Sequence, residues 1–450
     1  MAMAYIRVLA ISILLLLASI NLPKVTAAAV SEEAPGSGSY QFELIHVDAN
    51  GNFSREQLIR RALNKARMRG AMLSAAEHKE GDGDRDRDDT NSGAVSGSFS
   101  VPVQYSPYTY IMELKMGSTT MRAVADTGSD IIWTNQHMDC IGNPSFTPTN
   151  ESCAKACLDE KKQCITCMIN QTYGGGKKMK GFLGTETLAL PTGNGAATKD
   201  VALVCAIEWS PEMLPEDGQG VVGLGRGPMS LVKQLRVTQF SYCLRDPLDA
   251  ALRSPLWFGG NAQSAAGGKD GWRTTALVEI STERSQLPVW AENDYYVQLD
   301  EICINDECSG PFKQEDFKLK SSHGDGDKGL MLVDSGCTYT HLDTKIFDAL
   351  KSVLYRALGV TVVEKDGMNC FKAPRSGGKP DLVLKFPKAD MSVPWASYVE
   401  EGEQDFCLYI LEGRWSILGN FQQHNVSMLY DLDKKELSFK RVEECSSLTK

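Results

Sequence analysis

The chain has 450 residues, a formal net charge of -10, 42% hydrophobic residues and 8% aromatic residues. A chain of this length can bury a large core, in one large domain or two medium ones. The acidic balance argues against nucleic acid as a partner, because a phosphate-binding surface is basic.

The first 27 residues predict a secretory signal peptide. Arg7 precedes an apolar run from Val8 to about Leu22, and an Ala-rich segment follows it. A signal anchor is the alternative, but the run is shorter than the ~20 residues that span a bilayer comfortably. We therefore expect cleavage near Ala27, export of the chain and no stable membrane insertion.

Residues 28–98 predict a propeptide. The stretch YQFELIHV, from Tyr40, favours a strand, and a capping box at Ser54 and Gln57 starts a helix with a basic face. The polar tether HKEGDGDRDRDDTNSG follows, which is typical of a disordered segment and lacks the spacing of an EF-hand. Such tethers are where proteolytic nicking concentrates. The order of these segments predicts a zymogen with its boundary near Ser98.

From Phe99 onward the sequence predicts an all-β body. Short apolar runs such as YIMELKMG and ELSFKRV alternate with Gly, Pro and Asn turns. A helix, DTKIFDALKSVLYRAL, interrupts them. The body also repeats itself, because AVADTGS is followed by GVVGLG, and MLVDSGC by WSILGN. This repeat predicts two similar lobes, which we place at residues 99–248 and 249–450.

The repeat places one carboxylate on a tight turn in each predicted lobe. These are Asp126 and Asp334, and Gly128 and Gly336 allow the turns to be tight. Two carboxylates within hydrogen-bonding range cannot both ionise, so they share a proton. The unprotonated one can activate water as a general base while the other polarises a peptide carbonyl. The pattern predicts peptide hydrolysis that needs no cofactor.

These motifs, with the closing ILGNFQQHNVSMLYDLDKKELSF, resemble the pepsin-type aspartic endopeptidases, and most of all the plant secreted group that includes the nepenthesins. The resemblance covers nearly the whole body. It implies an all-β, bilobal fold with pseudo-two-fold related lobes and an active-site cleft between them. It further implies Asp126 and Asp334 as the catalytic pair, acting on polypeptide substrates at acidic pH. We expect a monomer, secreted to the apoplast or cell wall, with the vacuole as the alternative destination.

The resemblance also implies roles for the residues beside the two aspartates. Thr127 and Ser335 match the residues that lock the two turns against each other. Ser129 matches a hydroxyl that donates to the outer oxygen of Asp126.

A third set of residues matches the flap that closes over substrate. Tyr173, in TYGGGKKMKGFLGTETL, matches the flap tyrosine, and Trp133 matches the tryptophan that hydrogen-bonds it. The flap departs from its relatives, which usually carry Asp and Ser where this chain has Gly175 and either Gly176 or Lys177.

Cys337 stands where relatives usually have Thr, three residues after Asp334. A thiol is a weaker hydrogen-bond donor than a hydroxyl. Because a donor favours the charged form of a carboxylate, we expect Asp334 to be the more basic of the two.

All thirteen cysteines lie at or beyond Cys140, which in an exported chain favours disulfides. CINDEC can close locally between Cys303 and Cys308. The resemblance implies pairs between Cys370 and Cys407 and between Cys243 and Cys445. If Cys337 is left over, six cysteines have pairings that the sequence leaves open: Cys140, Cys153, Cys157, Cys164, Cys167 and Cys205.

The spacing of four of these six cysteines could also suit zinc, but an oxidising compartment favours disulfides, so we expect no metal. Four sequons fit the same compartment, at Asn52, Asn150, Asn170 and Asn425.

The alternative function is a non-catalytic pepsin-fold binding or inhibitor protein of the plant extracellular space. Relatives of this fold include inhibitors of glycan-degrading enzymes that have lost part of the aspartate pair. Both aspartates are present here, which favours the enzyme, whereas Cys337 and the altered flap leave the alternative open.

Overall fold

The fold is that of a computed structural model, which describes residues 40–46, 110–136, 168–173, 177–192, 195–215, 218–246, 253–260, 262–265, 270–280, 292–312, 329–365, 368–374, 378–402 and 405–445. The predicted signal peptide, basic helix and tether lie outside the described residues. So do the sequons at Asn52 and Asn150 and the cysteines from Cys140 to Cys167. No helix in the described ranges is both long enough and apolar enough to cross a membrane.

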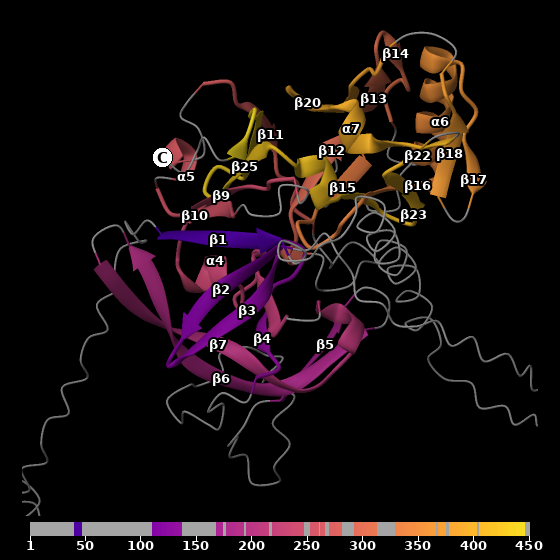
Figure 1. Cartoon of the computed structure of the whole chain (residues 1–450). Coiled ribbons are helices and arrows are strands. Elements are labelled where there is room, and N and C mark those ends of the chain that lie inside the picture. The colour runs from indigo at the N-terminus through magenta and orange to yellow at the C-terminus, as the bar shows by residue number, and fades with distance from the viewer. Residues whose placement is uncertain are drawn as a thin grey trace, which may run out of the picture. The chain divides into compact units, whose positions relative to one another are not determined.

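A 13-stranded sheet contains strands from both halves of the chain (Figure 1). Its order is β11-β26-β25-β9-β10-β1-β2-β3-β8-β4-β7-β6-β5. The strands are β1 (Tyr40–His46), β2 (Tyr110–Met116), β3 (Thr119–Asp126), β4 (Ile132–Thr134), β5 (Met168–Tyr173), β6 (Lys177–Thr192), β7 (Gly195–Trp209), β8 (Gly220–Gly223), β9 (Gln239–Cys243), β10 (Ser254–Phe258), β11 (Arg273–Ala276), β25 (Val426–Asp431) and β26 (Glu436–Arg441).

Three smaller sheets contain the remaining described strands of the second half. The five-stranded sheet has the order β12 (Tyr296–Leu299), β15 (Gly329–Val333), β24 (Ser416–Leu418), β16 (Thr340–Asp343) and β23 (Ile410–Gly413). One four-stranded sheet has the order β14 (Glu307–Cys308), β13 (Glu301–Ile304), β19 (Leu382–Phe386) and β20 (Ala389–Val393). The other has the order β17 (Val363–Lys365), β18 (Met368–Lys372), β22 (Asp405–Leu408) and β21 (Val399–Glu401). The predicted all-β fold is therefore confirmed.

The predicted helix is α6 (Thr344–Leu358). The Asp343 side chain caps its start by accepting from the Lys345 N–H, and Gly359 ends it in the left-handed conformation with φ 66°. Its apolar face is buried, including Ile346 and Leu350. The other helical segments are short: α4 (Leu231–Gln234), α5 (Ala262–Ala265), α7 (Trp395–Tyr398), η3 (Pro211–Met213) and η6 (Asn420–Gln423).

The internal repeat appears as the same strand pairing in each half. β3, which ends at Asp126, pairs in parallel with β8, and β8 pairs antiparallel with β4. β15, which leads to Asp334, pairs in parallel with β24, and β24 pairs antiparallel with β16. Asp126 is therefore the last residue of its strand and Asp334 directly follows its own, and the parallel neighbour of each strand is the apolar-Gly segment of the same half.

β1 lies within the segment that the sequence predicts to be the propeptide. It pairs antiparallel with β10 on one side and β2 on the other (Figure 1). Phe42 and Leu44 are buried in the main hydrophobic cluster, and the Phe42 ring meets Phe258 edge-on at 5.6 Å. The predicted propeptide thus supplies an interior strand of the 13-stranded sheet.

The three cysteine pairs expected above are disulfide-bonded: Cys243–Cys445, Cys303–Cys308 and Cys370–Cys407. Cys205 is also disulfide-bonded, whereas Cys337 is buried and in no disulfide. Of the two described sequons, Asn170 is exposed on β5, and Asn425 is half-buried in a turn with φ 54°. Glycosylation at either stays a prediction.

Candidate active site

The two aspartate turns are joined by reciprocal hydrogen bonds. The Thr127 N–H donates to Ser335 Oγ at 3.0 Å, and the Ser335 N–H donates to Thr127 Oγ1 at 2.9 Å. Each hydroxyl then donates to a carbonyl of the opposite half, Thr127 to Val333 at 2.9 Å and Ser335 to Ala125 at 3.0 Å. All these groups are buried, so the four bonds hold the ends of β3 and β15 in a fixed relation.

Each carboxylate packs against the glycine of the opposite turn. A Cβ added to Gly128 would lie 2.8 Å from Asp334 Cγ, and a Cβ added to Gly336 would lie 2.7 Å from Asp126 Cγ. No residue with a side chain fits at either position without displacing a carboxylate. The glycines thus bring Asp126 and Asp334 to one point from two halves of the chain.

Backbone groups of each turn orient the carboxylates. The Gly128 N–H donates to Asp126 Oδ1 at 3.0 Å. The N–H groups of Gly336 and Cys337 donate to Asp334 Oδ1 at 2.8 and 3.0 Å. Asp126 is 4% exposed and Asp334 1% exposed, so both carboxyls are buried.

Ser129 and Cys337 each follow an aspartate of the pair by three residues. The Ser129 hydroxyl is buried and has no hydrogen-bond partner among the described residues, so the expected donation to Asp126 is wrong for this structure. The Cys337 Sγ lies 3.4 Å from the Tyr339 carbonyl oxygen, to which the thiol donates. The effect of Cys337 on the basicity of Asp334 stays a prediction.

The flap residues lie on the β5–β6 hairpin. Tyr173 ends β5, pairs with Lys177 and is half-buried in the apolar cluster that contains Trp133. The Trp133 Nε1 has no hydrogen-bond partner in the described part of the chain, so the expected bond to Tyr173 is wrong. Trp133 contributes a fully buried ring instead. Gly175 and Gly176 lie outside the described residues.

Two tyrosines of the 13-stranded sheet support the Thr127 turn, and the sequence analysis missed both. Tyr430 interacts with the Thr127 side chain, and its hydroxyl lies 3.0 Å from that of Tyr242. The Tyr242 hydroxyl donates to Gln423 Oε1 at 2.6 Å. Burial raises the pKa of both tyrosines, so their hydroxyls remain protonated donors. Each tyrosine looks like an ordinary core residue in its strand.

Two further carboxyls, also missed, lie near the aspartate pair: Asp294 is buried and Asp130 is half-buried. Asp294 is 2% exposed; burial raises its pKa well above the usual range, and the nearby Asp130, Asp334 and Asp126 raise it further. Burial also raises the pKa of Asp130 to about 6, although hydrogen bonds from Gly227 and Asn293 oppose the change. DTGSD contains Asp130, but an acidic residue in a turn carries no signal of burial.

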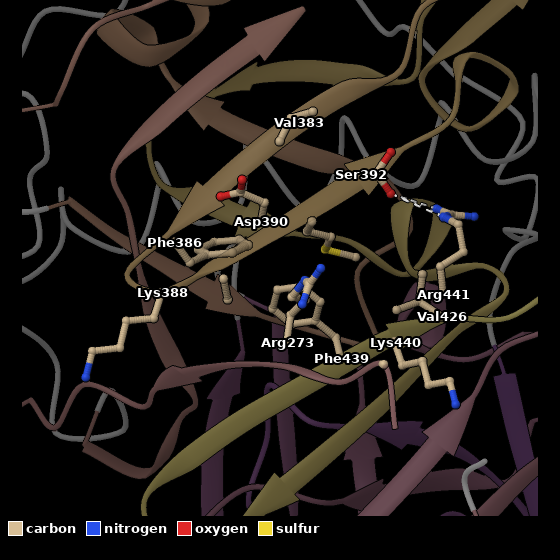
Figure 2. A pocket seen from close by; sticks show the side chains of 13 residues that line it. Arg273, Val383, Phe386, Lys388, Asp390, Ser392, Val426, Phe439, Lys440 and Arg441 are labelled. Carbon is tan, nitrogen blue, oxygen red and sulfur yellow. Dashed lines mark hydrogen bonds between the residues drawn. The ribbon is translucent and has the colours of Figure 1, made fainter. Parts of the chain in front are cut away.

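The groove in Figure 2 is a separate feature of the second half. It has a volume of about 660 Å³, and four basic side chains line it: Arg273, Lys388, Lys440 and Arg441. Arg441 is held by the Ser392 carbonyl, to which its Nη2 donates at 2.9 Å. Neither aspartate of the pair lines this groove, so it is not part of the candidate active site.

Comparison with known proteins agrees with this geometry. Residues 110–260 match the family model described as xylanase inhibitor N-terminal, and residues 294–441 match xylanase inhibitor C-terminal. The chain is 28% identical to aspartic proteinase nepenthesin-1 of Nepenthes gracilis, over 92% of each chain. It is 27% identical to aspartyl protease 37 of Oryza sativa subsp. japonica, over 94% of this chain and 98% of the relative.

The fold is also similar to solved structures. Basic 7S globulin from soybean matches with a TM-score of 0.58 and 18% identity, over 76% of this chain and 96% of the globulin. Conglutin gamma from lupine seeds matches with a TM-score of 0.57 at the same identity, over 76% of this chain and 95% of the conglutin. Together with the paired aspartate turns, the matches to the family models and to the aspartic proteinases show that the chain belongs to the pepsin-like aspartic protease family, in the plant group that includes the nepenthesins.

Proposed function

We propose that this protein is an aspartic endopeptidase that hydrolyses peptide bonds at acidic pH. The observation that carries the proposal is the reciprocal packing of Asp126 against Gly336 and of Asp334 against Gly128. In the buried pair, the unprotonated carboxylate takes a proton from a bound water, and the protonated one donates to the scissile carbonyl. The names of the relatives, which are aspartic proteinases, support the same activity.

The substrate is a polypeptide, and the β5–β6 hairpin with Tyr173 is the element that would close over it. Export to the extracellular space is supported by the apolar N-terminus and by the disulfides. A zymogen is supported by the order of the N-terminal segments. Because β1 is hydrogen-bonded on both sides, cleavage near Ser98 would by itself leave this strand in the sheet.

The test is cleavage of a peptide library by the full chain at about pH 4, where carboxylates titrate. We expect pepstatin to block cleavage and Asp126→Asn or Asp334→Asn to reduce it by about 10³-fold or more. Asp306→Asn, which changes an exposed aspartate in a turn, is the matched control and should retain activity. Cleavage that survives both active-site substitutions and pepstatin would contradict the proposal.

A second candidate is a binding protein that inhibits a glycan-degrading enzyme. It is supported by the match of both halves to models described as xylanase inhibitor. Inhibition of a xylanase by the Asp126→Asn variant distinguishes the two functions, because binding would survive this substitution and proteolysis would not. Inhibition that persists in the variant, in a chain that cleaves no peptide at any pH, would favour the second candidate.

A further inference from the structure

A set of hydrogen bonds joins the two halves next to the aspartate pair. It runs from the segment after β8, residues 224–227, to the segment before β12, residues 292–295. The Arg226 N–H donates to the Asn293 carbonyl at 2.7 Å, and Arg226 Nη2 donates to the Glu292 carbonyl at 2.8 Å. The Tyr295 hydroxyl donates to the Leu224 carbonyl at 2.8 Å. These three bonds all cross from the first half to the second.

Asp130 lies at the centre of this connection. It follows Asp126 by four residues, and its Oδ1 accepts the Gly227 N–H at 2.8 Å. Its side chain also bonds that of Asn293 in the other half. A Cβ at Gly227 would lie 2.5 Å from Asp130 Cγ, so the carboxyl is packed tightly against the loop. The position of the Asp126 turn is therefore tied to the segment that leads into β12.

The segment before β12 is also bonded to the strand that leads to Asp334. β12 pairs antiparallel with β15, and Tyr296 stands opposite Leu332. The Val333 N–H donates to the Tyr295 carbonyl at 2.9 Å, directly before Asp334. A shift of residues 292–295 would therefore move Asp334 relative to Asp126, and misplacing a catalytic group costs rate.

Asp294 is the group that makes this connection sensitive to charge. Its Oδ2 accepts the Tyr296 hydroxyl at 3.4 Å, and the carboxylates of Asp130, Asp126 and Asp334 lie near it. The charges facing Asp130 are Arg226 and Asp126 as well as Asp294, and Arg226 also lies 4.0 Å from Glu279. Arg226 is thus one cation among several acidic groups. Ionised Asp294 would add a further negative charge to this group.

We propose that Asp130 and Asp294 are positioning residues for the Asp126–Asp334 pair: Asp130 links the two halves beside the pair, and the link holds while the adjacent Asp294 is neutral. This inference rests on the proposed proteolytic function for its effect on activity. Burial raises the pKa of Asp130 to about 6, so the folded state keeps a proton that the unfolded chain releases above about 3.8. Ionising Asp130 places a negative charge beside Asp126 and Asp294, so the folded arrangement around the link loses stability as pH rises from about 4 to above 6, and activity falls reversibly with it.

The first arm of the test is the pH dependence of peptide cleavage by the full chain. Asp294→Asn keeps the shape of the side chain but cannot ionise, so we expect its alkaline limb to move up by about one pH unit. Asp130→Ala should lower kcat by about 10-fold or more with little change in KM, and Asp130→Asn, which keeps an acceptor, should restore most of the loss. The exposed control Asp306→Asn should match the wild type.

The second arm does not depend on activity. The amides of Arg226 and Gly227 report the link, and their hydrogen exchange is compared with their intrinsic rates between pH 4 and 7, a range that includes the pKa of Asp130 at about 6. We expect protection to fall with rising pH in the wild type and to stay in Asp294→Asn. Unchanged protection in the wild type, or an alkaline limb that Asp294→Asn does not move, would overturn the inference. If no peptide is cleaved, the proposed function is wrong, and the hydrogen-exchange comparison alone tests the inference about Asp130 and Asp294.

Discussion

Cys337 is the residue at which this chain departs from its relatives beside the aspartate pair. Its backbone N–H serves Asp334, while its thiol donates to the Tyr339 carbonyl at 3.4 Å. The Sγ also packs among buried apolar residues that include Trp415 and Ile417. A hydroxyl at this position could serve Asp334 as well, which the thiol does less well.

We expect Cys337→Thr to move the acidic limb of the pH–rate profile to lower pH, because an added hydroxyl donor favours the charged form of Asp334. The measurement is kcat/KM against pH for both proteins. Cys337→Ser, which adds a hydroxyl without the methyl group, is the matched control for volume. Profiles that coincide for all three proteins would remove any role for the thiol.

His424 is a buried imidazole that should limit stability in acid. Burial lowers its pKa from 6.5 to about 4, and the ring packs against Phe421 at 4.8 Å. The folded state therefore binds this proton less readily than the unfolded chain does. Stability is lost as pH falls from 6.5 to about 4, by about 3 kcal/mol in all.

We expect His424→Gln to narrow the difference in unfolding free energy between pH 7 and pH 4 by about 3 kcal/mol. The substitution also removes the contact with Phe421, so absolute stability can fall at both pH values while the difference still narrows. Denaturant titrations at the two pH values give this difference directly. An unchanged difference would show that the imidazole titrates alike in the folded and unfolded chains.

At the scale of elements, the ends of β3 and β15 should behave as one unit. Thr127→Ala and Ser335→Ala each remove two hydroxyl-mediated bonds of the same set, so either one alone disrupts the reciprocal pair. We expect a double-mutant cycle to give a coupling energy of roughly 1–2 kcal/mol. Unfolding free energies of the four proteins provide the cycle. Additive effects would mean that the two turns are held independently.

Some elements were predictable because their signals are local. The capping Asp343, the apolar spacing of α6 and the final Gly359 together specify that helix. The aspartate pair was predictable because the same short motif occurs twice in the chain.

Other features depend on contacts that no local pattern encodes. β1 pairs with β10, whose residues lie more than two hundred positions away, so an isolated strand-like run cannot reveal its partner. Asp294 stands in ENDYY, which has the composition of an ordinary loop, and its burial follows from the packing of both halves. The Ser129 and Trp133 hydrogen bonds were expected from relatives and depend on side-chain positions that a motif does not fix.

At the scale of the whole molecule, one disulfide ties strand β9 to the end of the described chain. Cys243 and Cys445 are 202 residues apart, whereas Cys303 and Cys308 are 5 apart. Closing a longer loop removes more entropy from the unfolded chain. We therefore expect the Cys243–Cys445 disulfide to stabilise the folded chain more than the Cys303–Cys308 disulfide does.

We expect Cys243→Ala/Cys445→Ala to lower the unfolding free energy by about 5 kcal/mol and the control Cys303→Ala/Cys308→Ala to lower it by about 2 kcal/mol. Denaturant unfolding of the full chain measures both. Equal losses would show that local packing, and not loop closure, sets the contribution of these bonds.

The proposed peptide hydrolysis depends on Asp126 and Asp334 holding one proton between them. The most direct measurement is a carbon-13 NMR titration of the aspartate carboxyl groups in the full chain, with Asp126→Asn and Asp334→Asn to assign the signals. We predict that both signals follow the same two steps, and that the partner of each substituted residue then titrates in a single step. Two carboxylates that titrate independently, each unaffected by loss of the other, would contradict the central claim.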